Sequence, residues 1–211
     1  ASRYGNPEDV PHFSPLATAP LPSIDRPLKP RQGILPLLDT LRDAEADLLG
    51  RHNAIQTVPY NGLAESLSQS LYLNSDGALR EMERTQASLY LCARAEEAGR
   101  KPRTGGAVRV ALGSSDLDVE GCVNEATDRT VSHLNYGPID TGSYRVCFTP
   151  EAFLSLLGAF SSMFNARAVI DGLSLSHRDS IGTKLAVPFL SLHDDGLHSG
   201  HISAAPFDGE G

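Results

Sequence analysis

The residues best suited to chemistry lie near the end of this sequence, where residues 193–201 read H-D-D-G-L-H-S-G-H. Imidazole nitrogens and carboxylate oxygens are common ligands of zinc and other divalent metals. The candidate ligands are His193, Asp195, His198 and His201. Their spacing lacks the helical H-E-x-x-H pattern, which places two imidazoles on one face, and the intervening glycines disfavour a helix. The segment is therefore either a weak metal site or a polar loop with an Asp-Gly turn.

A second group of reactive side chains lies between residues 171 and 179. It contains Asp171, Ser174, Ser176, His177 and Asp179. Serine, histidine and aspartate are the residue types of a nucleophilic triad. There is no G-x-S-x-G elbow, and the members of a triad usually converge from separate elements. The pattern therefore favours a polar loop over a catalytic triad.

Composition limits the classes of partner. The chain has 211 residues and a net charge of −8, which argues against direct binding to nucleic acid or to anionic membranes.

A small basic cluster, Arg100, Lys101 and Arg103, stands beside glycine and proline and predicts a solvated hairpin tip. The three cysteines are widely spaced and predict buried apolar residues, not disulfides. No membrane span or signal peptide is visible, so we expect a cytoplasmic protein.

The first half of the chain predicts one helix and an antiparallel meander. Residues 34–49 place leucines on one face, with Gly50 as the helix stop. Residues 63–73 alternate leucines with small polar residues, which is typical of a half-buried strand, and an Asp-Gly turn follows. The meander of four or five strands is expected at residues 54–60, 63–73, 79–85, 87–96 and 107–112.

The second half predicts helices and two short strands. A long helix is expected from an N-cap at residues 114–116 to about residue 134. Thr149 and Pro150 predict the start of another helix, which runs from Glu151 to Phe164 and carries a core-facing apolar stripe. Strands are expected at residues 144–148 and 187–192. Together these elements indicate an α+β fold, in which helices pack on an antiparallel meander.

Three regions follow from these patterns. Residues 1–33 are rich in proline and predict an extended linker or an arm that docks on its neighbours. Residues 34–147 form the α+β region. Residues 148–211 supply a helix, a loop and a strand.

Short motifs, in order, resemble the PmbA branch of the TldD/PmbA family. They are L-N-S-D-G at 73–77, D-R-T-V-S at 128–132, a G-T-K-L-A-V-P stretch at 182–188, L-H-D-D at 192–195 and P-F-D-G-E-G at 206–211. The last is the most specific. The residues that carry the resemblance most directly are Asn74, Ser75, Gly77, Pro206, Phe207, Asp208, Glu210 and Gly211.

The resemblance implies an α+β region followed by a β-rich C-terminal region. It also implies dimers, either with a second copy or with a TldD-type subunit, that process unfolded or precursor peptides. The TldD-type subunit carries H-E-x-x-x-H on a helix and holds a divalent metal, expected to be zinc, that activates water. Family members are longer, so this chain resembles a central fragment whose last region ends where a C-terminal β domain begins, and we expect exposed apolar patches.

This sequence departs from the family's metal motif. The expected helix at residues 151–164 has no histidine, and Glu151 is its only carboxylate. We therefore expect a PmbA-like, non-catalytic subunit of a metallopeptidase complex, with no cofactor in this chain. Two alternatives stay open: a metal-dependent peptidase that uses the loop from His193 to His201, and a protein-binding modulator linked to DNA gyrase.

Overall fold

The structure is a computed structural model, and it describes residues 20–74, 77–184, 186–198 and 200–209. The chain forms two compact units. One contains residues 1–137 and 195–211 and is called the sheet unit; the other contains residues 138–194 and is called the helical unit. None of the helices in the described ranges has the length and apolar character needed to cross a membrane.

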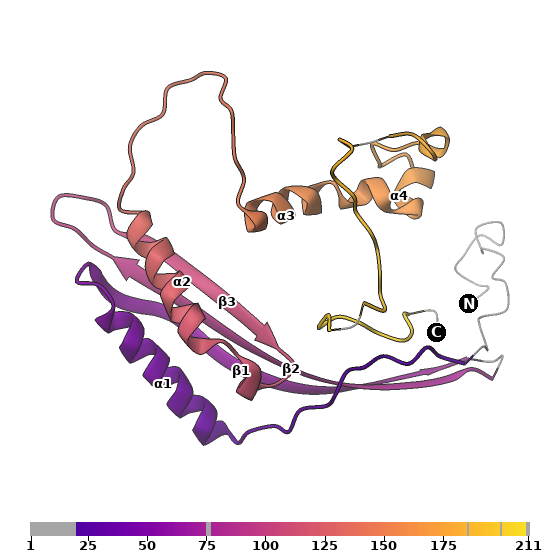
Figure 1. Ribbon diagram of the computed structural model, residues 1–211, viewed down its shortest axis with the longest axis horizontal. Coiled ribbons are helices and arrows are strands. Elements are labelled where there is room, and N and C mark those ends of the chain that lie inside the picture. The colour runs from indigo at the N-terminus through magenta and orange to yellow at the C-terminus, as the bar shows by residue number, and fades with distance from the viewer. Residues whose placement is uncertain (1–19, 75–76, 185, 199, 210–211) are drawn as a thin grey trace, which may run out of the picture. The chain divides into compact units, whose positions relative to one another are not determined.

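The sheet unit is built on a three-stranded antiparallel meander (Figure 1). Its strands are β1 (Ile55–Leu73), β2 (Leu79–Ala95) and β3 (Arg103–Ala111), in the order β1-β2-β3. The predicted meander is confirmed, but the expected four or five strands were wrong. Residues 54–60 and 63–73 join in one strand across an irregular register near Thr57 and Tyr60, and β2 likewise spans two predicted strands. Continuous pairing along β2 keeps the chain extended through residues that locally resemble turns.

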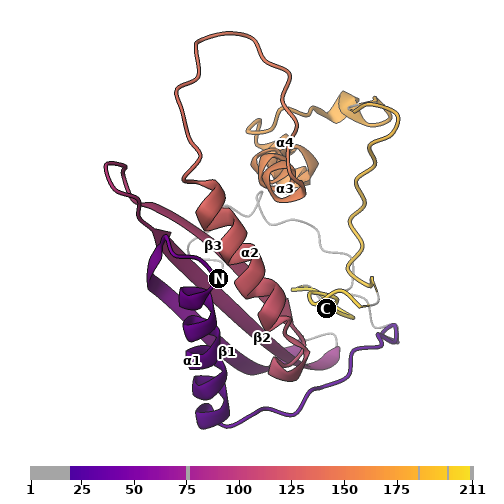
Figure 2. The same cartoon turned by 60° about the vertical axis from the view of Figure 1, so that its left-hand side comes forward.

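Two helices cover one face of this sheet. α1 (Ile34–Gly50) and α2 (Val119–Ser132) lie side by side in both views (Figures 1 and 2). The prediction for α1 is confirmed, including its end at Gly50. The predicted N-cap of α2 was wrong, because residues 114–116 form a short 3₁₀ turn, η2 (Ser114–Asp116). Asp118 caps the helix instead, and its carboxylate accepts a hydrogen bond of 2.9 Å from the Gly121 N–H.

The core lies between the helices and the sheet. Alternate residues of β2 point toward the helices, so Leu89 and Leu91 are completely buried. Cys122 and Val123 of α2 meet them there, whereas Tyr90 points away and remains partly exposed. Two of the cysteines are buried as predicted, but Cys147 is exposed, so the prediction was wrong for it.

A close backbone contact fixes α2 on the sheet. A side chain on Gly105 of β3 would place its Cβ 2.5 Å from the Thr130 amide nitrogen and 2.8 Å from the Arg129 carbonyl carbon. Only glycine allows this approach, because the obstructing atoms belong to backbone that cannot rotate away. Thr130 is itself fully buried, and its hydroxyl donates a hydrogen bond to the Ala126 carbonyl within the helix.

The described part of the N-terminal arm is hydrogen-bonded to the rest of the sheet unit through its backbone. The Lys29 N–H donates to the Thr85 hydroxyl at 3.0 Å. The Gln32 N–H donates to the Glu65 carboxylate at 2.8 Å, and the Ser114 N–H donates to the other oxygen of the same carboxylate at 3.2 Å. Glu65 therefore ties the arm and the η2 turn to β1.

The helical unit contains short helices and turns. Its elements are α3 (Pro150–Ala159), η3 (Ser161–Phe164), α4 (Ala166–Ile170) and η4 (Arg178–Ser180). Thr149 caps α3 as predicted, accepting a hydrogen bond from the Ala152 N–H. The expected strands at 144–148 and 187–192 were wrong, since neither segment pairs with a strand among the described residues. The predicted burial of the apolar stripe was also wrong, because α3 has no buried residue.

We predict that Gly105→Ala destabilises the sheet unit by about 1–3 kcal/mol, because the new methyl group must push α2 away from β3. Gly62→Ala in β1 is the matched control, since nothing lies within 4 Å of its added Cβ. Its effect should stay within about 0.5 kcal/mol. Urea unfolding followed by circular dichroism measures both free energies of unfolding. Equal stabilities of the two variants would contradict the close contact.

Candidate functional site

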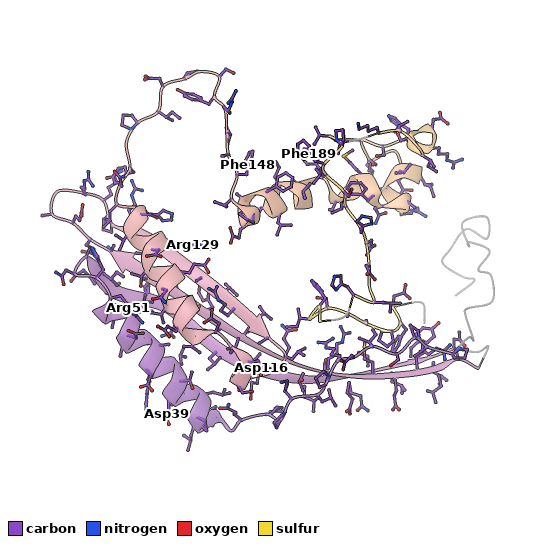
Figure 3. The ribbon with its side chains drawn as sticks, in the orientation of Figure 1. Asp39, Arg51, Asp116, Arg129, Phe148 and Phe189 are labelled. Carbon is purple, nitrogen blue, oxygen red and sulfur yellow. The ribbon has the colours of Figure 1, made fainter. Side chains whose placement is uncertain are left out.

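Polar side chains gather where α2 ends and β3 begins. His133 follows the last turn of α2, and its Nδ1 lies 2.7 Å from the Thr104 carbonyl oxygen. A carbonyl oxygen only accepts, so this contact places a proton on Nδ1. The Arg129 side chain also donates to the Gly106 carbonyl at 3.3 Å (Arg129 is labelled in Figure 3). The close contact at Gly105 makes both interactions possible, because it brings the last turn of α2 onto the first residues of β3.

The Tyr136 ring contacts two arginines just beyond the end of α2. The Arg103 guanidinium carbon lies 3.7 Å from the centre of the Tyr136 ring, and the corresponding Arg100 atom lies 5.6 Å from it. Arg100 also donates to the Leu134 carbonyl at 2.7 Å. Hydrogen bonding to Arg103, with a second hydrogen bond from the Lys101 backbone, lowers the pKa of the Tyr136 phenol below its usual value.

These residues line a cavity of about 940 Å³, called here the basic pocket. Its lining residues are Arg94, Lys101, Pro102, Arg103, Thr104, Ser132, His133, Asn135, Tyr136 and Gly137. They come from β2, the β2–β3 turn, β3 and the end of α2. The sequence indicated part of this site through its basic cluster, which does lie at a hairpin tip. It gave no signal for Arg94, His133 or Tyr136, which meet that cluster only in the folded chain.

The proposed metal-binding loop forms a series of tight turns. The His198 N–H donates to the Asp195 carbonyl at 3.4 Å, and the His201 N–H donates to the His198 carbonyl at 3.1 Å. The Asp195 carboxylate accepts a hydrogen bond from the Leu197 N–H, as in an Asx turn. His193 belongs to the helical unit, whereas the other three candidates belong to the sheet unit. Across the described ranges, no group of three or more His, Cys, Asp or Glu residues could hold a metal ion.

The Ser/His/Asp segment is also used in local turns. The Ser176 N–H donates to the Ser174 hydroxyl at 3.0 Å, and the His177 N–H donates to the Ser180 hydroxyl at 2.9 Å. The Asp171 carboxylate pairs with Arg167 at 2.8 Å. Ser174, Ser180 and Asp171 therefore serve in local turns and at the end of α4, whereas the buried Ser176 hydroxyl has no hydrogen-bond partner among the described residues.

Two apolar grooves mark the helical unit. One, of about 490 Å³, lies between the end of α3 and residues 183–192, and its lining includes Leu157 and Phe160. The other, of about 500 Å³, lies between α4 and residues 176–181. Met163 and Phe164 line both. The first groove therefore places apolar surface beside the end of α3, and the second places it beside α4.

The residues that carry the family resemblance lie in two places. Asn74 and Gly77 form the β1–β2 turn, where the Asn74 side-chain oxygen accepts a hydrogen bond of 2.9 Å from the Ala78 N–H. Gly77 has φ +87°, a conformation that favours glycine. Pro206 and Phe207 are half-buried and Asp208 is exposed, just after the buried Ala204, whose carbonyl accepts from Arg26 at 3.0 Å. Ser75, Glu210 and Gly211 lie outside the described residues.

Family models match most of the chain. Residues 29–134 match the PmbA/TldA metallopeptidase central domain, and residues 141–211 match the PmbA/TldA metallopeptidase C-terminal domain. No curated protein matches.

Two solved structures share the fold. One is a candidate modulator of a DNA gyrase from Thermotoga maritima, with 21% identity, a TM-score of 0.75, and coverage of 91% of this chain and 46% of that chain. The other, a candidate modulator of DNA gyrase from Bacteroides thetaiotaomicron, has 18% identity, a TM-score of 0.63, and coverage of 74% and 36%. This chain therefore spans less than half the length of either structure.

We predict that the Tyr136 phenol ionises at a lower pH than an ordinary tyrosine, because hydrogen bonding to Arg103 favours the phenolate. Arg103→Gln should raise the pKa of Tyr136 toward the usual value. A pH titration of ¹³Cζ-labelled tyrosine followed by NMR measures this, with Tyr136→Phe to assign the resonance. A Tyr136 pKa that is the same with and without Arg103 would contradict the stacked arrangement.

Proposed function

Because this chain belongs to the PmbA/TldD metallopeptidase family, we propose that it is a PmbA-like, non-catalytic subunit. Its complex would act on unfolded or precursor peptides, with a TldD-type subunit as the partner and the holder of the divalent metal. The single observation that carries this proposal is the composition of α3, the helix where the family resemblance leads one to expect the metal motif.

The residues of α3 do not fit a metal ion. Metal-binding helices of this kind place two imidazoles on one face, so that both nitrogens reach the same ion. α3 contains no histidine, and Glu151, in its first turn, is its only ionisable residue. Thr149 and Pro150 fix where the helix starts. Apart from Glu151, the positions after Pro150 carry apolar or small side chains. α3 therefore supplies no set of metal ligands for peptide hydrolysis.

The surface of the helical unit supports a role in assembly. Phe164 is 59% exposed and Phe189, labelled in Figure 3, is 89% exposed. Monomeric proteins rarely expose large contiguous apolar patches, and such patches commonly mark contacts with other protein segments. The two apolar grooves around Met163 and Phe164 provide recesses into which a partner's apolar side chains could insert.

We predict that this protein co-purifies with a TldD-type subunit, and that zinc and peptide cleavage depend on that subunit. Phe160→Ser should weaken the complex about tenfold, since it removes an apolar wall of one groove. Leu73→Ser is the matched control, because Leu73 is an exposed leucine at the end of β1 in the other unit. Size-exclusion chromatography and metal analysis of the complex measure both effects.

Three outcomes would count against this proposal. Stoichiometric metal in this chain alone, lost in His198→Ala or His201→Ala, would favour the loop from His193 to His201 as a peptidase site. Cleavage that is unchanged when this subunit is omitted would remove its role in the complex. Capture of gyrase in place of a TldD-type subunit would favour the modulator alternative, which matches how the two solved structures are described.

A further inference from the structure

We propose that the basic pocket of the sheet unit binds a peptide through a carboxylate group, either a free C-terminus or an acidic side chain. The pocket lies apart from the helical unit's grooves in sequence and composition. The choice of a peptide as the ligand rests on the proposed function, whereas the choice of a carboxylate rests on the pocket itself.

The charge of the pocket is opposite to that of the chain. The whole sequence has a net charge of −8, yet the described residues that line the pocket include Arg94, Lys101 and Arg103 and no carboxylate. Bringing like charges together costs free energy unless an opposite charge compensates them. A concave site that gathers cations in an acidic protein is therefore suited to an anion.

The cations differ in how far the fold already neutralises them. Arg94 pairs with Glu96 at 3.1 Å, and Arg100 pairs with Glu97 at 3.2 Å. Within the described ranges, neither Lys101 nor Arg103 lies within ion-pair distance of a carboxylate. These two side chains flank Pro102 at the start of β3, and both line the pocket. Among the described residues, no carboxylate therefore compensates the positive charges of Lys101 and Arg103 at the wall of the basic pocket.

Arg103 is held in a geometry suited to a carboxylate. Its guanidinium carbon lies over the Tyr136 ring, 3.7 Å from the ring centre, and one of its donors hydrogen-bonds to the Tyr136 phenol, so this contact holds the side chain in place while its other N–H groups can still donate. A planar fork of N–H donors matches the two oxygens of a carboxylate. Its Nε is buried and has no hydrogen-bond partner among the described residues, so an acceptor is missing at this position.

The other polar groups narrow the class of ligand. His133 donates from Nδ1 to the Thr104 carbonyl, so Nε2 is the ring nitrogen that is left for a ligand. Tyr136, Pro102 and Gly137 add apolar and aromatic wall. At about 940 Å³ the cavity is large enough for a few residues of peptide beside the carboxylate. Duplex nucleic acid needs an extended basic face, which a chain of charge −8 does not favour.

The test uses the whole chain and the peptide acetyl-Ala-Ala-Ala, prepared with a free C-terminus and with a C-terminal amide. Acetyl-Ala-Asp-Ala-amide carries the carboxylate on a side chain and separates the two sources. NMR of the arginine Nε–H groups reports directly on Arg103, and the titration yields a Kd. We expect the free acid to shift the Arg103 resonance and to bind at least about tenfold more tightly than the amide. The amide binds more weakly because it lacks the carboxylate that forms a charge-assisted hydrogen-bonded pair with Arg103.

Variants separate the pocket from general charge effects. Arg103→Gln should lose the preference for the acid over the amide, and Lys101→Gln should weaken binding of the acid. Arg42→Gln is the matched control, because Arg42 is an exposed cation on α1, 3.9 Å from Asp39, outside the pocket lining. It should leave the Kd unchanged. Circular dichroism checks that each variant is folded. If Arg103→Gln does not fold, Lys101→Gln still tests whether the pocket binds the carboxylate.

Equal binding of acid and amide, or an unchanged Kd in both pocket variants, would overturn the carboxylate site. Tighter binding of inorganic phosphate or of a short DNA duplex than of the free-acid peptide would overturn the choice of ligand. None of these results depends on a TldD-type partner or on peptide cleavage. Loss of the complex with intact carboxylate binding would therefore count against the proposed function alone.

Discussion

The close approach of α2 to β3 at Gly105 is the contact on which the sheet unit depends. It lets the buried Thr130 lie directly against the strand, and it aligns the helix so that Cys122 and Val123 reach Leu89 and Leu91 in the core. Small residues on β2 and β3, such as Ala93 and Ala107, keep the helix near the sheet. Packing at this separation gains dispersion contacts that a larger residue at position 105 would remove.

The same contact determines where chemistry can occur in the sheet unit. It brings the end of α2 beside the first residues of β3, so that His133 reaches the Thr104 carbonyl and Tyr136 stacks on Arg103. The helical unit has a different character. Its helices are short, and α3 has no buried residue, so this unit presents apolar surface and grooves. The two proposals rest on these two surfaces separately.

Local patterns predicted helices well where the signal lies within a few residues of the helix itself. The leucine spacing of α1 and the capping residues of α3 are short-range signals, and the structure confirmed both. The wrong strand predictions in the second half of the chain share a cause. Residues 187–192 have the composition of a strand, but a strand requires a neighbouring strand, and none pairs with them in the described chain. Conversely, pairing with β2 carried β1 through residues that look like a break.

The sequence by itself determined the family, the α+β class, and the absence of histidine from α3, because these depend on residue identity, order and short-range periodicity. Only the tertiary structure decided that Arg94, Arg103, His133 and Tyr136 line one pocket. These residues come from separate elements, and their meeting depends on a long-range backbone contact at Gly105. No local pattern encodes such a contact, since a glycine that permits close packing looks in sequence like a glycine in a turn.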